Sequence, residues 1–324
     1  MNFFEEIFVI SDIILPYDFK YHIEYYVIYP WITNRSELIR ILEDDDGKVY
    51  KVAISQSLDN CDNRLNIIVN VRSNEVITGQ AIDWIRETIS RCLGLNENVT
   101  DFISIVNRDP ILTAAIQNRY GRRDKSTPTL FEGMMNVIFS QNARFSRIYS
   151  MANNFCTMYG KKIELPEGTY YSFPTPYKIS QLSIDEIKES KVGYRAKVIK
   201  EIANFFCENR NELKNVKYWD ECKIEKFFSN INGVGPYTIN LFLHVALRKL
   251  DKVHIDSYVR EILNTFYLKD RHYDDEEMVD FCNKRWGKYS GSIISILTTD
   301  TEIWAESIGV KMNIKSGAAM KNNN

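Results

Sequence analysis

The hydrophobic periodicity of this chain changes once, near residue 80, and that change restricts the fold class most. Before it, short runs rich in β-branched and aromatic residues alternate with polar turns, as in an antiparallel sheet; they cover residues 22–32, 47–56 and 65–73. After it, apolar residues recur at helical spacing. The predicted helices cover residues 81–93, 129–141, 145–160, 183–190, 194–209, 222–231, 238–250, 257–267 and 275–287. The pattern predicts an α+β protein, with an ordered loop at 161–178.

Two of the predicted helices are joined by a very short turn, INGVGPY (231–237). Gly233 and Gly235 allow backbone angles and close approaches that a side chain would forbid. Pro236 suits the first turn of the second helix, where its missing N–H costs nothing. The free N–H groups of that turn form an anion site, which suits a phosphate. An ordinary corner between two helices is the alternative, because G-x-G before a helix is a weak signal alone.

An aspartate follows this helical hairpin at a short separation in the sequence. Asp256 lies 19 residues after Tyr237, in the segment VHIDSYV, where the chain is expected to turn back and begin its next helix. By itself an Asp in this place is most simply a helix N-cap. Hairpin and aspartate together favour a functional reading.

Charge is distributed unevenly along the chain. Residues 1–100 contain 16 Asp and Glu against 9 Lys and Arg, a net charge of −7, so residues 101–324 hold the remaining 27 acids and 32 bases, a net of +5. The basic residues gather in RYGRRDK (119–125), ARFSR (143–147) and KESKVGYRAKVIK (188–200). Such clusters could face a nucleic-acid backbone, although a run of charges is more often a solvated helix face.

The hairpin and the aspartate segment resemble those of the helix-hairpin-helix (HhH-GPD) DNA glycosylases, nearest the alkyl-purine and 8-oxoguanine branches. INGVGPYTIN is similar to the family's hairpin and VHIDSYV to its catalytic aspartate segment. LFEGMMNVIFSQNARFSRI resembles the helix that carries the base-wedging residue, and KVGYRAKVIKEIANF resembles the family's G-Y-R-A-K helix. The likeness covers roughly residues 100–305 and implies a core of two helical lobes behind an N-terminal sheet domain.

The resemblance implies roles for single residues. Asp256 is then the catalytic carboxylate, which stabilises positive charge on the sugar and orients water. Asn142 takes the wedge position, filling the space left by an extruded base. Phosphate contacts are expected from the hairpin and from the G-Y-R-A-K helix. These residues are Gly233, Val234, Gly235, Arg195 and Lys197.

One departure from the bifunctional members concerns the nucleophile. They carry a lysine two positions after the second hairpin glycine, and this chain has Tyr237 there. A tyrosine cannot form the imine that leads to strand nicking. An aromatic at this position can stack on a cationic base, so Tyr237 could form an aromatic pocket with Trp286 and Tyr289. Packing within the last helices is the equally weighted alternative for Trp286 and Tyr289.

The prediction is therefore a monofunctional base-excision-repair DNA glycosylase that removes a damaged purine, with an alkylated base preferred. An 8-oxoguanine or deaminated-base enzyme is the rival within the class, and a non-catalytic DNA-binding module is the rival outside it. The expected domains are a sheet domain (1–100), a helical core (101–310, with its hairpin at 224–250) and a disordered tail (311–324).

The remaining expectations concern ligands and surroundings. The partner is double-stranded DNA with a damaged base, and the protein is expected to be a monomer. The six scattered cysteines form no C-x-x-C pair, so no metal or iron–sulfur cluster is expected. No cofactor is expected. The alternative left open is a monovalent cation bound at the hairpin. The chain has no run of about eighteen apolar residues and no signal-peptide pattern, so we expect no membrane partner and a location in the cytoplasm of a prokaryote, or wherever the genomic DNA lies.

Overall fold

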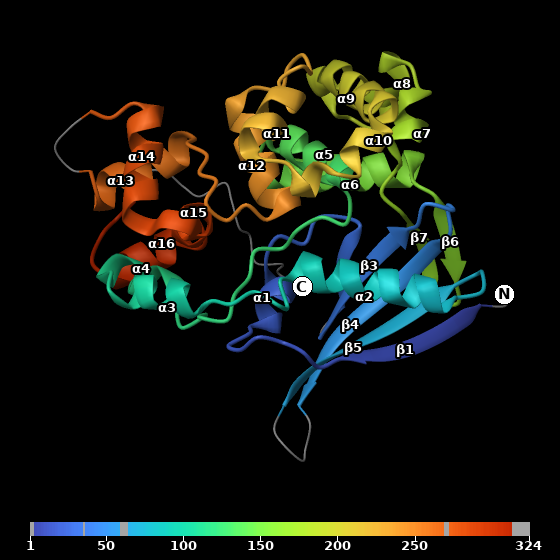
Figure 1. Cartoon of the computed structure of the whole chain (residues 1–324), viewed down its shortest axis with the longest axis horizontal. Coiled ribbons are helices and arrows are strands. Elements are labelled where there is room, and N and C mark those ends of the chain that lie inside the picture. Colours follow the sequence, from blue (N-terminus) through green and yellow to red (C-terminus); the bar gives the residue numbers. More distant parts are fainter. Residues whose placement is uncertain (1–2, 35, 59–63, 269–271, 313–324) are drawn as a thin grey trace.

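An antiparallel sheet forms the N-terminal part of the molecule, as the alternating runs predict. The structure is a computed structural model that describes residues 3–34, 36–58, 64–268 and 272–312 (Figure 1). The strand order is β1-β5-β4-β3-β2, and every neighbouring pair is antiparallel. The strands are β1 (Phe4–Ile10), β2 (Trp31–Asn34), β3 (Glu37–Glu43), β4 (Val49–Leu58) and β5 (Leu65–Ser73).

The two faces of this sheet are covered by different elements (Figure 1). Helix α2 (Gly79–Leu93) packs on one face and buries Ile85 and Ile89 against strand residues such as Val52. The other face is covered by a small hairpin of β6 (Lys162–Leu165) and β7 (Gly168–Tyr171), whose Ile163 packs against Ile41. The second face is covered only in part, since β1 leaves Ile7 and Val9 exposed, and the β6–β7 hairpin joins this face to the helical part of the chain.

The helices form two lobes with separate cores. The first lobe contains α5 (Leu130–Ser140), α6 (Phe145–Tyr159), α7 (Pro176–Ser180), α8 (Ile184–Glu189), α9 (Ala196–Glu208), α10 (Arg210–Leu213), α11 (Glu221–Phe228) and α12 (Pro236–Leu247). The second lobe contains α3 (Thr100–Asn107), α4 (Pro110–Ile116), α13 (Ser257–Phe266), α14 (Asp275–Trp286), α15 (Ser290–Leu297) and α16 (Thr301–Ser307).

The chain passes between the two lobes twice, and we call each connecting segment a crossing. The chain enters the second lobe first, through α3 and α4, and crosses to the first lobe over residues 117–129. It returns over residues 248–256, between α12 and α13 (Figure 1). The α+β fold with an N-terminal sheet and two helical lobes is thus confirmed.

Two segments differ from the expectation. Residues 161–178, expected as a loop, form β6, β7 and the short helix α7, because Ile163 and Leu165 alternate with polar residues and cover a sheet face. Residues 19–24, partly inside an expected strand, form α1 (Phe19–Glu24), which Asp18 caps by accepting the N–H of Tyr21 over 3.1 Å.

The domain boundaries at 100 and 310 stay predictions. The expected tail 311–324 falls, from residue 313 onward, outside the described residues. Among the described residues, none of the helices combines the length and the apolar character needed to cross a membrane.

Candidate active site

The hairpin between α11 and α12 has the backbone that its glycines allow. Gly233 has a φ of +88°, in the left-handed region, and a Cβ there would lie 3.0 Å from Cγ2 of Val198 in α9. Val234 is buried, and its N–H donates to the carbonyl of Ile231 over 3.1 Å. Gly235 is the N-cap of α12, no side chain caps this helix, and a Cβ on Gly235 would meet nothing within 4 Å among the described atoms. The first turn of α12 therefore presents uncapped N–H groups beside an open backbone.

Asp256 begins α13 directly after the second crossing between the lobes. It is the N-cap of that helix, and its Oδ1 accepts the N–H of Val259 over 2.7 Å. The residue is exposed. Asp256 can therefore act both as the N-cap and as the expected catalytic carboxylate. Oδ1 caps the helix, whereas Oδ2 has no hydrogen bond among the described residues.

Tyr237, in the first turn of α12, faces the Asp256 segment. Its ring meets the ring of His254 edge to face, with centroids 5.8 Å apart and planes at 83°. Burial, together with the negative charge of Asp256, raises the pKa of the Tyr237 hydroxyl to about 12. The hydroxyl consequently stays protonated at neutral pH, and the hairpin and the aspartate lie in one electrostatic environment.

The predicted wedge residue occupies an exposed turn after α5. Asn142 has a φ of +48°, a left-handed conformation that Asn tolerates better than most residues. The preceding Gln141 donates from Nε2 to Oγ1 of Thr238 in α12 over 3.1 Å. This bond attaches the wedge turn to the hairpin helix, so Asn142 is held next to the candidate site.

The two cations expected to contact phosphate have different surroundings. Arg195 is buried, and its guanidinium donates to the carbonyls of Ile138 and Gln141 at the end of α5 and to that of Val192, three residues before it in the chain. The guanidinium therefore holds the turn that contains Gln141 and Asn142 from inside the protein. Lys197, two residues later, is exposed, and the neighbouring Val198 is the residue that borders Gly233.

Trp286 and Tyr289 are not brought to Tyr237. Trp286 is 2% exposed and packs against Tyr267 and Phe281, with ring centroids 5.3 and 6.0 Å away. Tyr289 is also buried, and Phe102 packs against it in the second lobe. The two rings contribute to the core of that lobe, so the structure does not form the aromatic pocket proposed from the sequence.

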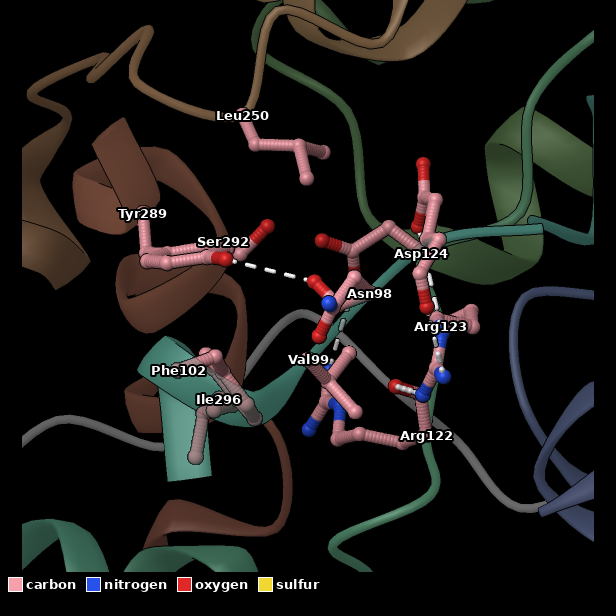
Figure 2. Close-up of a pocket in the computed structure, with 11 residues that line it drawn as sticks. Asn98, Val99, Phe102, Arg122, Arg123, Asp124, Leu250, Tyr289, Ser292 and Ile296 are labelled. Atoms are coloured by element: carbon pink, nitrogen blue, oxygen red, sulfur yellow. Dashed lines mark hydrogen bonds and ion pairs between the residues drawn. The ribbon is translucent and has the colours of Figure 1, made fainter. Parts of the chain in front are cut away.

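Tyr289 borders a small cavity between the second lobe and the first crossing, residues 117–129 (Figure 2). Its hydroxyl donates to the carbonyl of Asn98 over 3.3 Å, and Asp124 and Ser292 also line the cavity. The cavity measures about 30 Å³. That space suits one water molecule and excludes a nucleobase.

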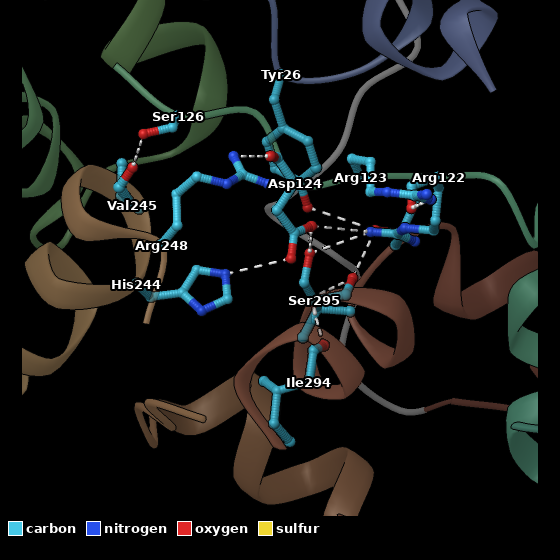
Figure 3. Close-up of polar contacts among 12 residues, drawn as sticks. Tyr26, Arg122, Arg123, Asp124, Ser126, His244, Val245, Arg248, Ile294 and Ser295 are labelled. Carbon is cyan, nitrogen blue, oxygen red and sulfur yellow. Dashed lines mark hydrogen bonds and ion pairs between the residues drawn. The ribbon is translucent and has the colours of Figure 1, made fainter. Parts of the chain in front are cut away.

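Sequence reasoning missed a buried polar cluster where the lobes meet, here named the lobe seam: Arg122, Asp124, His244 and Ser295 (Figure 3). Asp124 accepts from Nε2 of His244 over 3.3 Å and from Oγ of Ser295 over 2.8 Å, and Arg122 lies 3.5 Å away. Although burial opposes it, these partners hold the pKa of the Asp124 carboxyl well below its usual range.

The interpretation of one basic cluster changes with these contacts. The cluster RYGRRDK, considered as a phosphate-binding surface, is mostly internal: Arg122 and Arg123 are buried, and Arg119 pairs with Asp18 and Glu24. The exposed cations near the wedge turn belong to the other two clusters. They are Arg144, Arg147, Lys191 and Lys197.

No group of three or more His, Cys, Asp or Glu side chains within the described ranges could hold a metal ion. The cation at the hairpin stays a prediction.

Comparison with known proteins agrees with this geometry. The sequence model of the HhH-GPD superfamily base excision DNA repair proteins matches residues 135–288. A probable N-glycosylase/DNA lyase of Methanothermobacter thermautotrophicus is 22% identical over 223 residues, which cover 63% of this chain and 70% of that protein. A DNA-3-methyladenine glycosylase of Bacillus subtilis is 27% identical over 173 residues, 51% of this chain and 56% of that protein.

Solved structures show the same fold over most of the chain. MBOgg1, determined with a low-affinity DNA ligand, superposes with a TM-score of 0.68 at 21% identity and covers 95% of this chain and 100% of its own. The 3-methyladenine DNA-glycosylase of Archaeoglobus fulgidus gives 0.69 at 22% identity, covering 83% and 88%. Residues 135–288 thus match the HhH-GPD superfamily of base excision DNA repair proteins, and both relatives named above are glycosylases by name.

Proposed function

We propose that this protein is a monofunctional DNA glycosylase that extrudes a damaged purine from double-stranded DNA and hydrolyses its N-glycosidic bond, with an alkylated purine as the substrate. The observation that supports this most is the arrangement around Asp256. An exposed carboxylate lies beside an uncapped helical hairpin, and the position of the family's nucleophilic lysine carries Tyr237.

The carboxylate fits the charge that this reaction develops. Cleavage of the C1′–N bond leaves positive charge on the sugar. A carboxylate about 4 Å away stabilises that charge by about 4 kcal/mol at an effective dielectric of 20, close to a thousandfold in rate. Oδ2 of Asp256 is the oxygen that can do so, because Oδ1 caps α13.

Two lysines are engaged in contacts within the protein and a third lies far from Tyr237, which supports hydrolysis without an imine. Lys252 pairs with Glu221 over 2.6 Å. Lys125, whose pKa burial lowers to about 7, donates to the carbonyl of His22 over 2.7 Å and to two further carbonyls. Lys249 lies just beyond the C-terminal end of α12, and that end is about 15 Å along the helix axis from Tyr237.

The DNA contacts follow from the surface around the site. The uncapped N–H groups of α12 and the exposed Lys197 favour phosphate, and such contacts position the duplex without reading its sequence. Asn142 lies beside them on an exposed turn and serves as the wedge. An extruded base then reaches Tyr237, which can stack on an electron-poor, cationic purine.

A second candidate keeps the reaction class and changes the base. The archaeal relative is named as an N-glycosylase/DNA lyase, and the fold of MBOgg1 covers nearly the whole chain, including the sheet domain. Excision of 8-oxoguanine is therefore the alternative to excision of an alkylated purine.

The test uses a panel of end-labelled duplexes with 3-methyladenine, 7-methylguanine, hypoxanthine or 8-oxoguanine at one position. Released bases are identified by mass spectrometry, and each reaction is divided before electrophoresis, with one half heated in alkali. We expect strand cleavage in the alkali half only and no adduct after borohydride treatment. Nicking without alkali together with a trapped adduct would refute the monofunctional assignment, and release of 8-oxoguanine alone would select the alternative.

A further inference from the structure

A second side chain accompanies Asp256 in the segment between α12 and α13. His254 lies two residues before Asp256, which is in extended backbone with φ −112° and ψ −179°. Tyr237 lies near both side chains, because its ring contacts the ring of His254, and burial together with the charge of Asp256 raises the pKa of its hydroxyl.

The His254 ring has hydrogen-bonding capacity that the protein does not use. Its Nδ1 is buried and has no hydrogen-bond partner among the described residues. A buried polar atom left without a partner costs about 1–3 kcal/mol, so such an atom in a native site calls for an explanation. His244 on α12 also has an unused Nδ1, but its Nε2 pairs with Asp124 in the lobe seam.

The protonation state of His254 suits a group that binds water. Burial, reinforced by the neighbouring His244, lowers the pKa of His254 to about 4, although Asp256 opposes the change. At neutral pH the ring is therefore uncharged, with one nitrogen as donor and the other as acceptor. A neutral ring also avoids placing a positive charge beside the cationic sugar.

Hydrolysis without an amine needs an oriented water molecule, and Asp256 alone has one free carboxylate oxygen for that purpose. A single hydrogen bond leaves the water free to rotate about it, whereas two bonds direct a lone pair toward C1′. We infer that His254 positions the attacking water, together with Oδ2 of Asp256.

The step balances as follows, given the glycosylase function proposed above. The C1′–N bond breaks and its electron pair leaves with the base. The water donates one hydrogen bond to Nε2 of His254, since the buried Nδ1 is closed to solvent, and one to Oδ2 of Asp256, and its free lone pair forms the C1′–O bond. The proton lost by the water passes to the Asp256 carboxylate.

The first test compares two replacements that separate packing from hydrogen bonding. His254→Phe keeps a ring against Tyr237 and removes both nitrogens, whereas His254→Asn keeps an acceptor and a donor on a shorter side chain. We expect single-turnover base release to fall about 10- to 100-fold in His254→Phe and to recover in part in His254→Asn, with duplex affinity within about twofold of wild type.

The result separates this inference from the function on which it rests. If His254→Phe releases base at the wild-type rate while Asp256→Asn does not, His254 has no part in the step and the glycosylase assignment stands. If the wild-type protein releases no base from any duplex of the panel, the assignment itself fails.

A second readout applies even where His254→Phe does not fold. In methanol–water mixtures the sugar cation is captured by either nucleophile, and methanol leaves an alkali-stable 1′-methoxy strand that mass spectrometry detects. A site that positions water disfavours methanol, so His254→Asn should raise the methanol-to-water product ratio about threefold or more relative to wild type. An unchanged ratio in His254→Asn would contradict the inference, because a residue needed only for packing does not select the nucleophile.

Discussion

At the scale of single residues, Asp256 combines two functions that can be separated by mutation. Its Oδ1 caps α13, and its exposed carboxylate carries the charge needed at the sugar. Asn caps a helix about as well as Asp but carries no charge. Asp256→Asn therefore removes one function and keeps the other, whereas Asp256→Ala removes both.

We predict that Asp256→Asn lowers base release by about two to four orders of magnitude and leaves lesion-DNA affinity within a few fold, as expected for a group that acts on the transition state. Its thermal midpoint should match that of wild type. Asp256→Ala should lose a similar amount of activity and in addition about 1 kcal/mol of stability. Single-turnover kinetics and thermal unfolding check both variants, and near wild-type turnover in Asp256→Asn would remove this residue from the mechanism.

Residue types could be assigned from the sequence, but their exposure could not. The spacing of the hairpin and Asp256 pointed to one site, and the structure places Asp256 beside Tyr237. Arg195 has the charge of a phosphate ligand, yet its guanidinium donates to three backbone carbonyls, two of them at the end of α5. Trp286 has the ring of a stacking residue, yet it lies in a core. Such differences depend on neighbours that are distant in sequence.

At the scale of elements, the hairpin uses its two glycines for different purposes. Gly233 needs its left-handed backbone and the space beside Val198. Gly235 has a φ of −99°, which any residue adopts, and open space on its outer side. Gly233 is therefore required by the fold, and Gly235 by whatever approaches the hairpin.

We predict that Gly233→Ala lowers stability by about 1–2 kcal/mol, because a left-handed backbone strains an alanine and its Cβ crowds Val198. Urea unfolding measures this change. Stability at or above the wild-type value would show that the hairpin backbone differs from the one described.

Replacing Gly235 gives the opposite pattern. Gly235→Leu should leave the urea midpoint nearly unchanged and weaken binding to damaged and undamaged duplexes by the same factor, because phosphate contacts carry no sequence information. Fluorescence anisotropy with both duplexes tests this expectation. A loss confined to lesion-containing DNA would contradict the phosphate role of the hairpin.

Elements with a long, strongly periodic apolar face were predicted well, and those stabilised by distant partners were not. The helices α2, α5, α6, α9, α12 and α14 lie where helical spacing indicated. The hairpin 162–171 was taken for a loop, because its strands have four residues each and its stability comes from covering the sheet. Helix α1 depends in the same way on buried contacts of Phe19 and Tyr21.

At the scale of the whole molecule, ionic pairs connect units that are distant in sequence. Arg40 of the sheet forms a buried ion pair with Glu132 of α5, 92 residues away. The lobe seam joins the first crossing to α12 and α15 (Figure 3). The sequence did not indicate these pairs, because their members are far apart in the chain, and the cluster 119–125 was considered as a surface. Their burial indicates that the relative placement of the lobes, and hence of Asp256 and the hairpin, depends on them.

The lobe seam gives a prediction about stability and its dependence on pH. Asp124→Asn removes the negative charge and leaves Arg122 buried without its acidic partner, so it should lower the free energy of unfolding by about 3 kcal/mol at neutral pH. The Asp124 carboxyl has a folded-state pKa below its unfolded value. Its contribution is therefore fully present above the unfolded pKa, near 4, and is lost as the pH falls toward the folded value.

Urea unfolding of both proteins between pH 3 and pH 7 tests this, and the difference between them should be constant above about pH 5 and shrink below about pH 4. Asp185→Asn is the matched control, since Asp185 also pairs with a cation, Lys188, but its side chain is 91% exposed. That control should leave the free energy of unfolding close to the wild-type value, because exposed ion pairs contribute little. Equal effects of the two substitutions would mean that the lobe seam is solvated, and the lobes would then be held together by their apolar contacts alone.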